Sequence, residues 1–333
     1  MRQNTLQYQY TTGRFTLPVV YFICTLCWII AGFFTPAKLF SATSGNPIWE
    51  MIPFDWIPNW VLLLGAYVTL SIVGYILIQQ NNQFTIITQR ATVQSSLYLV
   101  FITAIPQVHI IQPGVIAGLC FSISTFFLFY SYKEWDSMIQ QFFAAIFMSF
   151  LFLLIPKMIL LFPLLILTKI VFNNLNIRTF FATLLGFILP LWFLLAHAIW
   201  HDQMDLFTAP FLDLMQWGQW NDYSNLQGKD IATFGYILFI TILSLAYILF
   251  SKTRMRVRTR QILNHFLRIT LGIVVLIVFT PKQLNSYIPI WLICISFIYG
   301  HALVSIHSKL TNLIFLGTIL LLAVLFVYNT WML

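Results

Sequence analysis

Long apolar runs separated by short polar segments fill most of this chain of 333 residues. Most of them approach the ~20 residues that an α-helix needs to cross the hydrocarbon core of a bilayer. The runs predict about eleven membrane-spanning helices, near residues 15–34, 59–79, 91–108, 113–130, 139–155, 157–172, 180–200, 231–250, 262–280, 287–304 and 310–331. We therefore expect an all-α fold, a polytopic bundle of transmembrane helices, with residues 1–333 in a single integral membrane domain.

The composition makes lipid the solvent of this chain. Hydrophobic residues make up 60% of the sequence and charged residues 8%, whereas charged residues are roughly 25% of an ordinary soluble domain. A soluble core could not bury so much apolar surface. The first apolar run is longer than the ~7–15 residues of a secretory signal, so we expect it to remain as the first span.

The span at 231–250 has ends of opposite charge, and these ends predict its direction. The polar segment before it is rich in aspartate, and the segment after it is basic and contains no acid. Lysine and arginine concentrate on the cytoplasmic side of membrane proteins. With eleven spans, the N-terminus then lies in the cytoplasm, the C-terminus lies outside, and thirteen of the 17 Lys and Arg residues lie inside.

The same direction makes residues 35–58 and 201–230 outer loops and residues 251–261 a basic cytoplasmic loop. If this basic loop is extended, its alternating charges face one side and contact anionic lipid headgroups; they are Lys252, Arg254, Arg256, Arg258 and Arg260. No Gly-rich phosphate loop accompanies them, and the sequence predicts neither a nucleic-acid partner nor a cofactor. Tryptophans also concentrate near the predicted outer interface, at positions 49, 56, 60, 200, 217, 220, 291 and 331.

Residues 139–172 form an almost continuous apolar stretch that is broken only by Pro156 and Lys157. We interpret it as a tight hairpin of two short arms, because a single crossing here would invert the charge pattern on one side of it. A re-entrant hairpin within the membrane is the alternative, with Lys157 extending to the outer headgroups.

Gly114 and Gly118 open the fourth span with the spacing that allows a neighbouring helix to approach closely.

The outer end of the seventh span carries the residues with the clearest metal-binding chemistry. His197 and His201 lie four residues apart on one helical face, and Asp205 is one further turn away if the helix continues. Two imidazoles and a carboxylate can bind zinc. The alternative is a polar helix end that contacts water and headgroups, because this spacing is common by chance.

Acidic outer loops also suit a sugar-transfer reaction that uses a polyprenyl-phosphate donor. Glu50 or Asp55 in the first outer loop is then the catalytic base that accepts a proton from an acceptor hydroxyl. The donor phosphate needs basic residues on the same side, which are limited to Lys38, Lys157, Lys229 and Lys282. The alternative is that these acids only solvate a surface loop.

The segment from Asn176 to Pro190 resembles an uncharacterised family of polytopic inner-membrane proteins of the Bacteroidota. Arg178, Gly186 and Pro190 carry this resemblance, which covers about residues 60–200. It implies a Gram-negative inner membrane with the outer loops in the periplasm, and it implies no activity for any residue. On their own terms, Gly186 and Pro190 are expected to shape the packing of the seventh span.

These patterns leave three functional classes. A non-catalytic component of envelope biogenesis or of a membrane complex is favoured over the glycan-transfer enzyme. A transporter is the third class, and the scarcity of charges at mid-membrane depth argues against it. The expected partners are membrane lipids and another membrane protein.

Overall fold

A computed structural model of the chain describes residues 5–34, 49, 56–87, 92–215, 226–251, 255–306 and 308–331. Within these residues the regular secondary structure is entirely helical. The α-helices are α1 Leu6–Thr12, α2 Thr16–Phe34, α4 Asn59–Phe84, α5 Val93–Thr103, α6 Pro113–Tyr130, α7 Met138–Leu154, α8 Phe162–Val171, α9 Ile177–Trp200, α10 Met204–Met215, α11 Gly228–Ser251, α12 Val257–Phe279, α13 Leu284–Ser305 and α14 Lys309–Trp331. Three short 3₁₀ helices are η2 Pro106–Val108, η3 Pro156–Leu161 and η6 Pro281–Gln283.

Eight helices in the described part of the chain are long and apolar enough to cross a membrane, namely α2, α4, α6, α9, α11, α12, α13 and α14. The prediction of an all-α, multi-pass membrane protein is therefore confirmed. The other three predicted spans correspond to α5, α7 and α8, which are shorter. Proline limits two of them, because Pro106 and Pro156 follow the last turns of α5 and α7 and restrict the residue before them to non-helical backbone.

The predicted hairpin at 139–172 consists of α7 as its first arm and of η3 followed by α8 as its second arm. The chain leaves α7 at Leu154, passes through η3 and continues directly into α8. At ~2.0 Å per 3₁₀ residue and ~1.5 Å per α-helical residue, η3 and α8 together extend about 27 Å. The second arm is thus close to the ~30 Å of a hydrocarbon core only when its 3₁₀ part is included.

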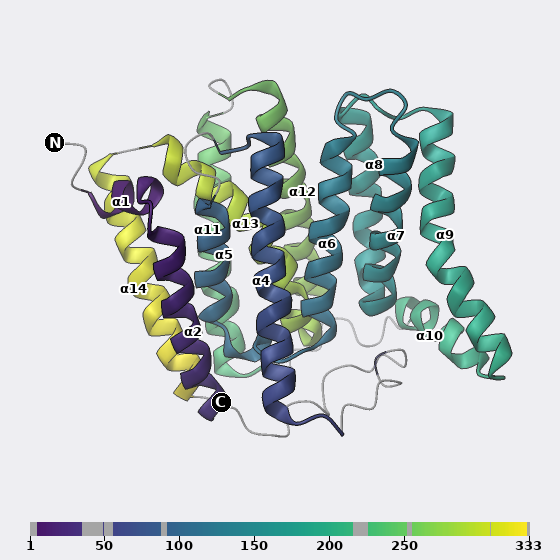
Figure 1. Cartoon of the computed structure of the whole chain (residues 1–333), viewed down its shortest axis with the longest axis horizontal. Helices are drawn as coiled ribbons and strands as arrows, with labels where there is room; N and C mark the ends of the chain where they lie inside the picture. Colours follow the sequence, from purple (N-terminus) through teal and green to yellow (C-terminus); the bar gives the residue numbers. More distant parts are fainter. Residues whose placement is uncertain are drawn as a thin grey trace.

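The helices lie side by side (Figure 1), and hydrogen bonds identify which segments meet at each end of the bundle. At the end that carries α1, the Gln7 amide donates to the carbonyl oxygens of Leu303, in the last turn of α13, and of Ile306, which follows α13. At the opposite end, the Asn329 amide of α14 donates to the carbonyl oxygen of Ala104 and to the Thr233 hydroxyl. We call the first of these the α1 end and the opposite one the α10 end, because helix α10 lies there (Figure 1).

Helix α13 forms the centre of the core. Most of its residues are buried, and it packs against α5, α6, α11 and α12. Trp291 of α13 is completely buried and donates to the Thr241 hydroxyl of α11 at 3.1 Å. Trp291 therefore satisfies its indole N–H inside the bundle and does not need interfacial water, whereas its depth in the membrane stays a prediction.

Glycines create the closest helix contacts. A Cβ on Gly114 would lie 2.6 Å from the backbone of Ser286, so α6 and α13 approach along the predicted small-residue face. A Cβ on Gly186 would overlap the carbonyl oxygen of Phe142, which brings α9 against α7. The expected packing roles of both glycines are confirmed.

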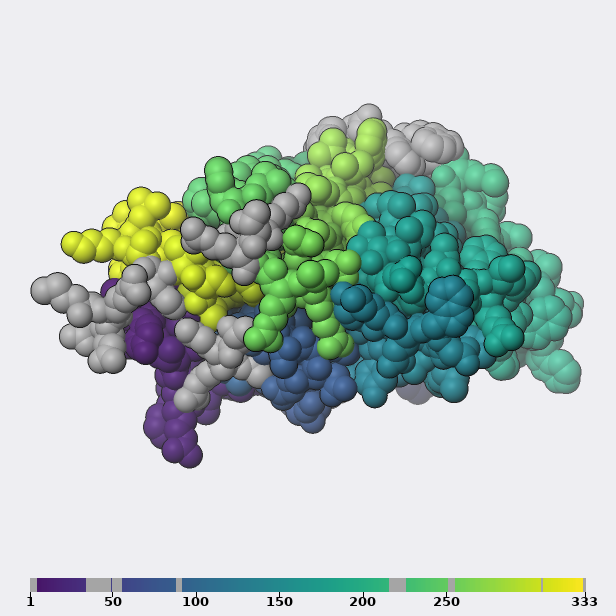
Figure 2. Space-filling model, turned by 90° about the horizontal axis from the view of Figure 1, so that it is seen from above, coloured from purple at the N-terminus to yellow at the C-terminus, as the bar shows by residue number. Residues whose placement is uncertain are grey.

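The first and last helices form one edge of the molecule, whereas α6 to α9 form the other. Figures 1 and 2 both place α1 and α2 beside α14 at one edge and α9 at the opposite edge. Tyr10 of α1 packs on Phe315 of α14 with ring centroids 5.2 Å apart. The two ends of the sequence therefore build one surface together.

Candidate functional site

The three predicted metal ligands do not lie on one continuous helix. Helix α9 ends at Trp200, and Asp202 adopts a left-handed conformation with φ of 53° before α10 begins at Met204. The rings of His197 and His201 are close, with centroids 4.4 Å apart, but Asp205 belongs to the next helix. Among the described residues, no group of three His, Cys, Asp or Glu side chains is placed to hold a metal ion.

The predicted catalytic acids, Glu50 and Asp55, lie outside the described residues, as does Lys38. The glycan-transfer reaction therefore stays a prediction. Of the other lysines proposed to hold a phosphate, Lys157 is already paired with an acid, and Lys229 is only 9% exposed.

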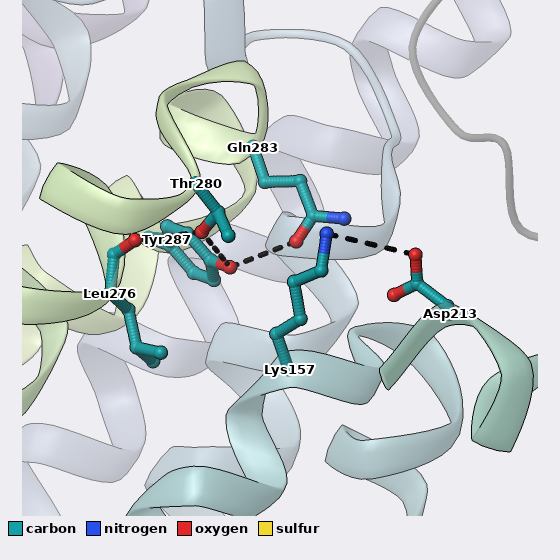
Figure 3. A network of polar contacts seen from close by, with 6 residues as sticks. All are labelled: Lys157, Asp213, Leu276, Thr280, Gln283 and Tyr287. Atoms are coloured by element: carbon teal, nitrogen blue, oxygen red, sulfur yellow. Dashed lines mark hydrogen bonds and ion pairs between the residues drawn. The ribbon is translucent and has the colours of Figure 1, made fainter. Parts of the chain in front are cut away.

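Lys157 forms a polar network at the α10 end that the sequence did not reveal (Figure 3). Its ammonium lies 3.7 Å from Asp213 Oδ1 of α10, and the Lys157 side chain is 4% exposed. Beside it, the Tyr287 hydroxyl of α13 donates to Gln283 Oε1 at 2.8 Å and lies 3.0 Å from Thr280 Oγ1. The network joins η3, α10 and the α12–α13 turn.

Within this network, Asp213 is the residue that neutralises Lys157. A buried ammonium needs a counter-charge, and α10 carries Asp213 to the place where the hairpin turns. The prediction that Lys157 extends to lipid headgroups is therefore wrong, because the side chain turns inward to this carboxylate. A cation that is already paired and buried has little capacity to hold a phosphate from solvent.

A second buried lysine lies in α8, nearer the α1 end. Lys169 is 1% exposed, and its amino nitrogen donates to the Thr183 hydroxyl of α9. The adjacent Thr168 lies 2.8 Å from His265 Nδ1 and accepts from Arg268 of α12 at 3.2 Å. These contacts tie α8 to both of its neighbours, and all the partners are side chains of the protein itself.

The basic loop predicted at 251–261 is partly helical. Lys252 and Arg254 lie outside the described residues, whereas α12 begins at Val257. The guanidinium of Arg258 lies 5.2 Å from the ring centroid of Phe84 and 5.4 Å from that of Tyr132. Arg258 therefore binds aromatic faces of α4 and the α6–α7 turn, and Arg256 is exposed.

An apolar groove between α2 and α14 has the geometry of a binding site. Its cavity volume is about 830 Å³, within the ~300–1,000 Å³ that is usual for ligand sites. The floor consists of buried residues from α2, α5 and α14, namely Val20, Cys24, Leu97, Phe101, Phe315 and Leu322. The rim consists of residues that are 42% to 63% exposed, namely Val19, Ile23, Ile319 and Val327.

The groove runs along the helices and has one polar end. From Phe315 to Val327 of α14 it extends about 18 Å, at ~1.5 Å per residue. At the α1 end it is closed by Gln9 and Arg14, both exposed. No sequence motif marks this groove, and its walls come from opposite ends of the chain, so the sequence alone did not predict it.

Comparisons of this chain with protein-family models, with curated proteins and with solved structures find no match. The resemblance of the segment from Asn176 to Pro190 to a membrane-protein family of the Bacteroidota stays a prediction.

Proposed function

We propose that this chain is a multi-pass protein of the bacterial inner membrane that holds a long-chain lipid in the groove between α2 and α14. In this role it is a non-catalytic component of envelope biogenesis or of a membrane complex. The observation that carries the proposal is the groove itself. It is apolar, has a volume of about 830 Å³, and its rim faces outward on two helices of spanning length.

The chemistry of the groove suits a hydrocarbon chain. Its lining is dominated by aliphatic and aromatic side chains, so a water-soluble ligand would lose its hydrogen bonds on entry. Its length of about 18 Å extends parallel to the helices, which is the direction of lipid chains in a bilayer. In an empty groove the side chains of the floor would lack dispersion contacts on their open side, and one bound hydrocarbon chain supplies these contacts.

The proposed topology has eleven crossings, with the N-terminus in the cytoplasm and the C-terminus in the periplasm. The charges at the two ends of the bundle support this direction. Arg14, Lys133, Arg178 and Lys309 flank helices at the α1 end, whereas Asp202, Asp205 and Asp213 lie in or directly before α10 at the α10 end. In this topology α5, α7 and the η3–α8 arm are the three short crossings.

Native mass spectrometry of protein purified gently with its own lipids tests the proposal. We expect one lipid bound per chain. Ala323→Trp places an indole in the groove and should abolish retention of that lipid, because Ala323 lines the groove. Val324→Trp is the matched control, since Val324 is the next residue, is 57% exposed and does not line the groove.

Wild-type protein without a retained lipid would overturn the proposal. Equal retention by the two tryptophan variants would overturn it as well, because the lipid would then lie elsewhere on the surface. Size-exclusion profiles and thermal unfolding of both variants establish that they are folded.

A further inference from the structure

We infer that the lipid in the groove is an acidic phospholipid, with one acyl chain along α14 and its phosphate beside Arg14. This inference rests on the proposed function and names the class of lipid. Three observations lead to it: the charge at the end of the groove, the absence of acidic residues from the helices around the groove, and the length of the groove.

Among the described residues that line the groove, Arg14 carries the single formal charge. Arg14 lies in the turn between α1 and α2, where the groove reaches the α1 end. Its side chain is exposed, and within the described residues no acidic group pairs with it. A guanidinium in this position is free to make charge-assisted, bidentate hydrogen bonds to a phosphate.

The segments around the groove contain no negative charge that would compete with such a ligand. Neither aspartate nor glutamate occurs in α1, α2, α5, α13 or α14. Lys309 adds a second positive charge where α14 begins at the same end of the bundle. An anionic headgroup is therefore attracted to this end of the groove by Arg14 and Lys309, and a cationic headgroup is repelled.

The length of the groove distinguishes a phospholipid chain from a much longer one. About 18 Å is slightly more than half of a hydrocarbon core of ~30 Å, which corresponds to one leaflet. An acyl chain whose headgroup lies at the α1 end fits this length without leaving its leaflet. In the proposed topology that leaflet is the cytoplasmic one.

Gln9 supplies a neutral partner beside Arg14. It lines the same end of the groove from α1, and its side-chain amide can donate to a phosphate oxygen. Helix α1 is held in place by Gln7, which is 1% exposed and bonded to the α13–α14 turn at 2.8 and 2.7 Å. The headgroup end of the groove is thus built on an anchored element.

The test uses the full chain in nanodiscs that contain equal amounts of phosphatidylglycerol and phosphatidylcholine. Native mass spectrometry after release then identifies the lipid that stays bound. We expect phosphatidylglycerol to be enriched about fivefold, the ratio given by the ~1 kcal/mol that one basic residue contributes with an anionic headgroup. Arg14→Gln should reduce this ratio to about one while a lipid is still retained.

Arg178→Gln is the matched control. Arg178 is also exposed and lies at the start of α9, but it does not line the groove. This variant should keep the fivefold enrichment. An equal loss in both variants would show a general surface attraction and would overturn the headgroup assignment.

The outcomes separate the inference from the proposed function. A retained lipid without headgroup preference, or a preference that Arg14→Gln leaves unchanged, overturns the inference and leaves lipid binding intact. A polyprenyl phosphate as the species retained from native membranes overturns the phospholipid assignment. A wild-type protein that retains no lipid overturns both.

Discussion

Replacing Gly186 by alanine should destabilise the protein although alanine is the better helix former. Gly186 lies inside α9, and a Cβ there would overlap the carbonyl oxygen of Phe142 and lie 3.1 Å from the Cβ of Ala145. The carbonyl oxygen of Phe142 belongs to the backbone and cannot move by a change of rotamer, so α7 and α9 must separate to accept the methyl group. Overpacking of this kind costs about 1–3 kcal/mol.

The helix propensity acts in the opposite direction and is the smaller effect. Glycine to alanine inside a helix gains about 0.8–1.0 kcal/mol. The net result at Gly186 is a loss of up to about 2 kcal/mol in the free energy of unfolding. At Gly317 of α14 a Cβ meets nothing within 4 Å, so Gly317→Ala keeps the propensity gain and should stabilise the protein slightly.

Thermal unfolding in a mild detergent, followed by tryptophan fluorescence, measures both variants. The 11 tryptophans provide a strong signal. Opposite shifts of the unfolding midpoint are expected, down for Gly186→Ala and up for Gly317→Ala. A rise for both variants would refute the close approach of α7 and α9, because propensity alone would then decide the result.

Two further predictions concern the ion pair and the topology. Lys157→Met leaves the Asp213 carboxylate without its partner and should lower the free energy of unfolding by about 2–3 kcal/mol. This is less than the ~3–5 kcal/mol of a fully buried pair, because Asp213 is 25% exposed. Adding Asp213→Leu should recover part of this loss in the same unfolding assay, and full stability of Lys157→Met alone would contradict the structure. For topology, single cysteines at Asp202 and Ser308, both exposed, are introduced into a cysteine-free variant. A membrane-impermeant maleimide should label the first in spheroplasts and the second only after lysis, and labelling from the same side would contradict eleven crossings.

The helices themselves were predictable because membrane insertion depends on local hydropathy. All eight described helices of spanning length fall on predicted apolar runs, and the other three predicted runs contain the shorter helices α5, α7 and α8. The close approach of α6 and α13 at Gly114 was also predictable, because small residues spaced by four mark close helix contacts in lipid.

The sites were less predictable because their residues are distant in the sequence. Lys157 and Asp213 come from η3 and α10 and meet only when both segments pack beside the α12–α13 turn. The left-handed Asp202 ended the helix that was expected to align Asp205 with His197 and His201. A local spacing rule assumes an unbroken helix, and a single residue with positive φ removes that assumption.

By itself, the sequence determined that this is a helical membrane protein and which segments form its long helices. Hydropathy and chain length decide this, because a helix in lipid must satisfy its backbone internally and match the bilayer thickness. Only the tertiary structure decided which helices are neighbours. In a uniformly apolar helix every face is compatible with lipid, so periodicity carries little information about packing partners. The pairing of α2 with α14, and with it the groove, therefore depends on contacts between opposite ends of the chain.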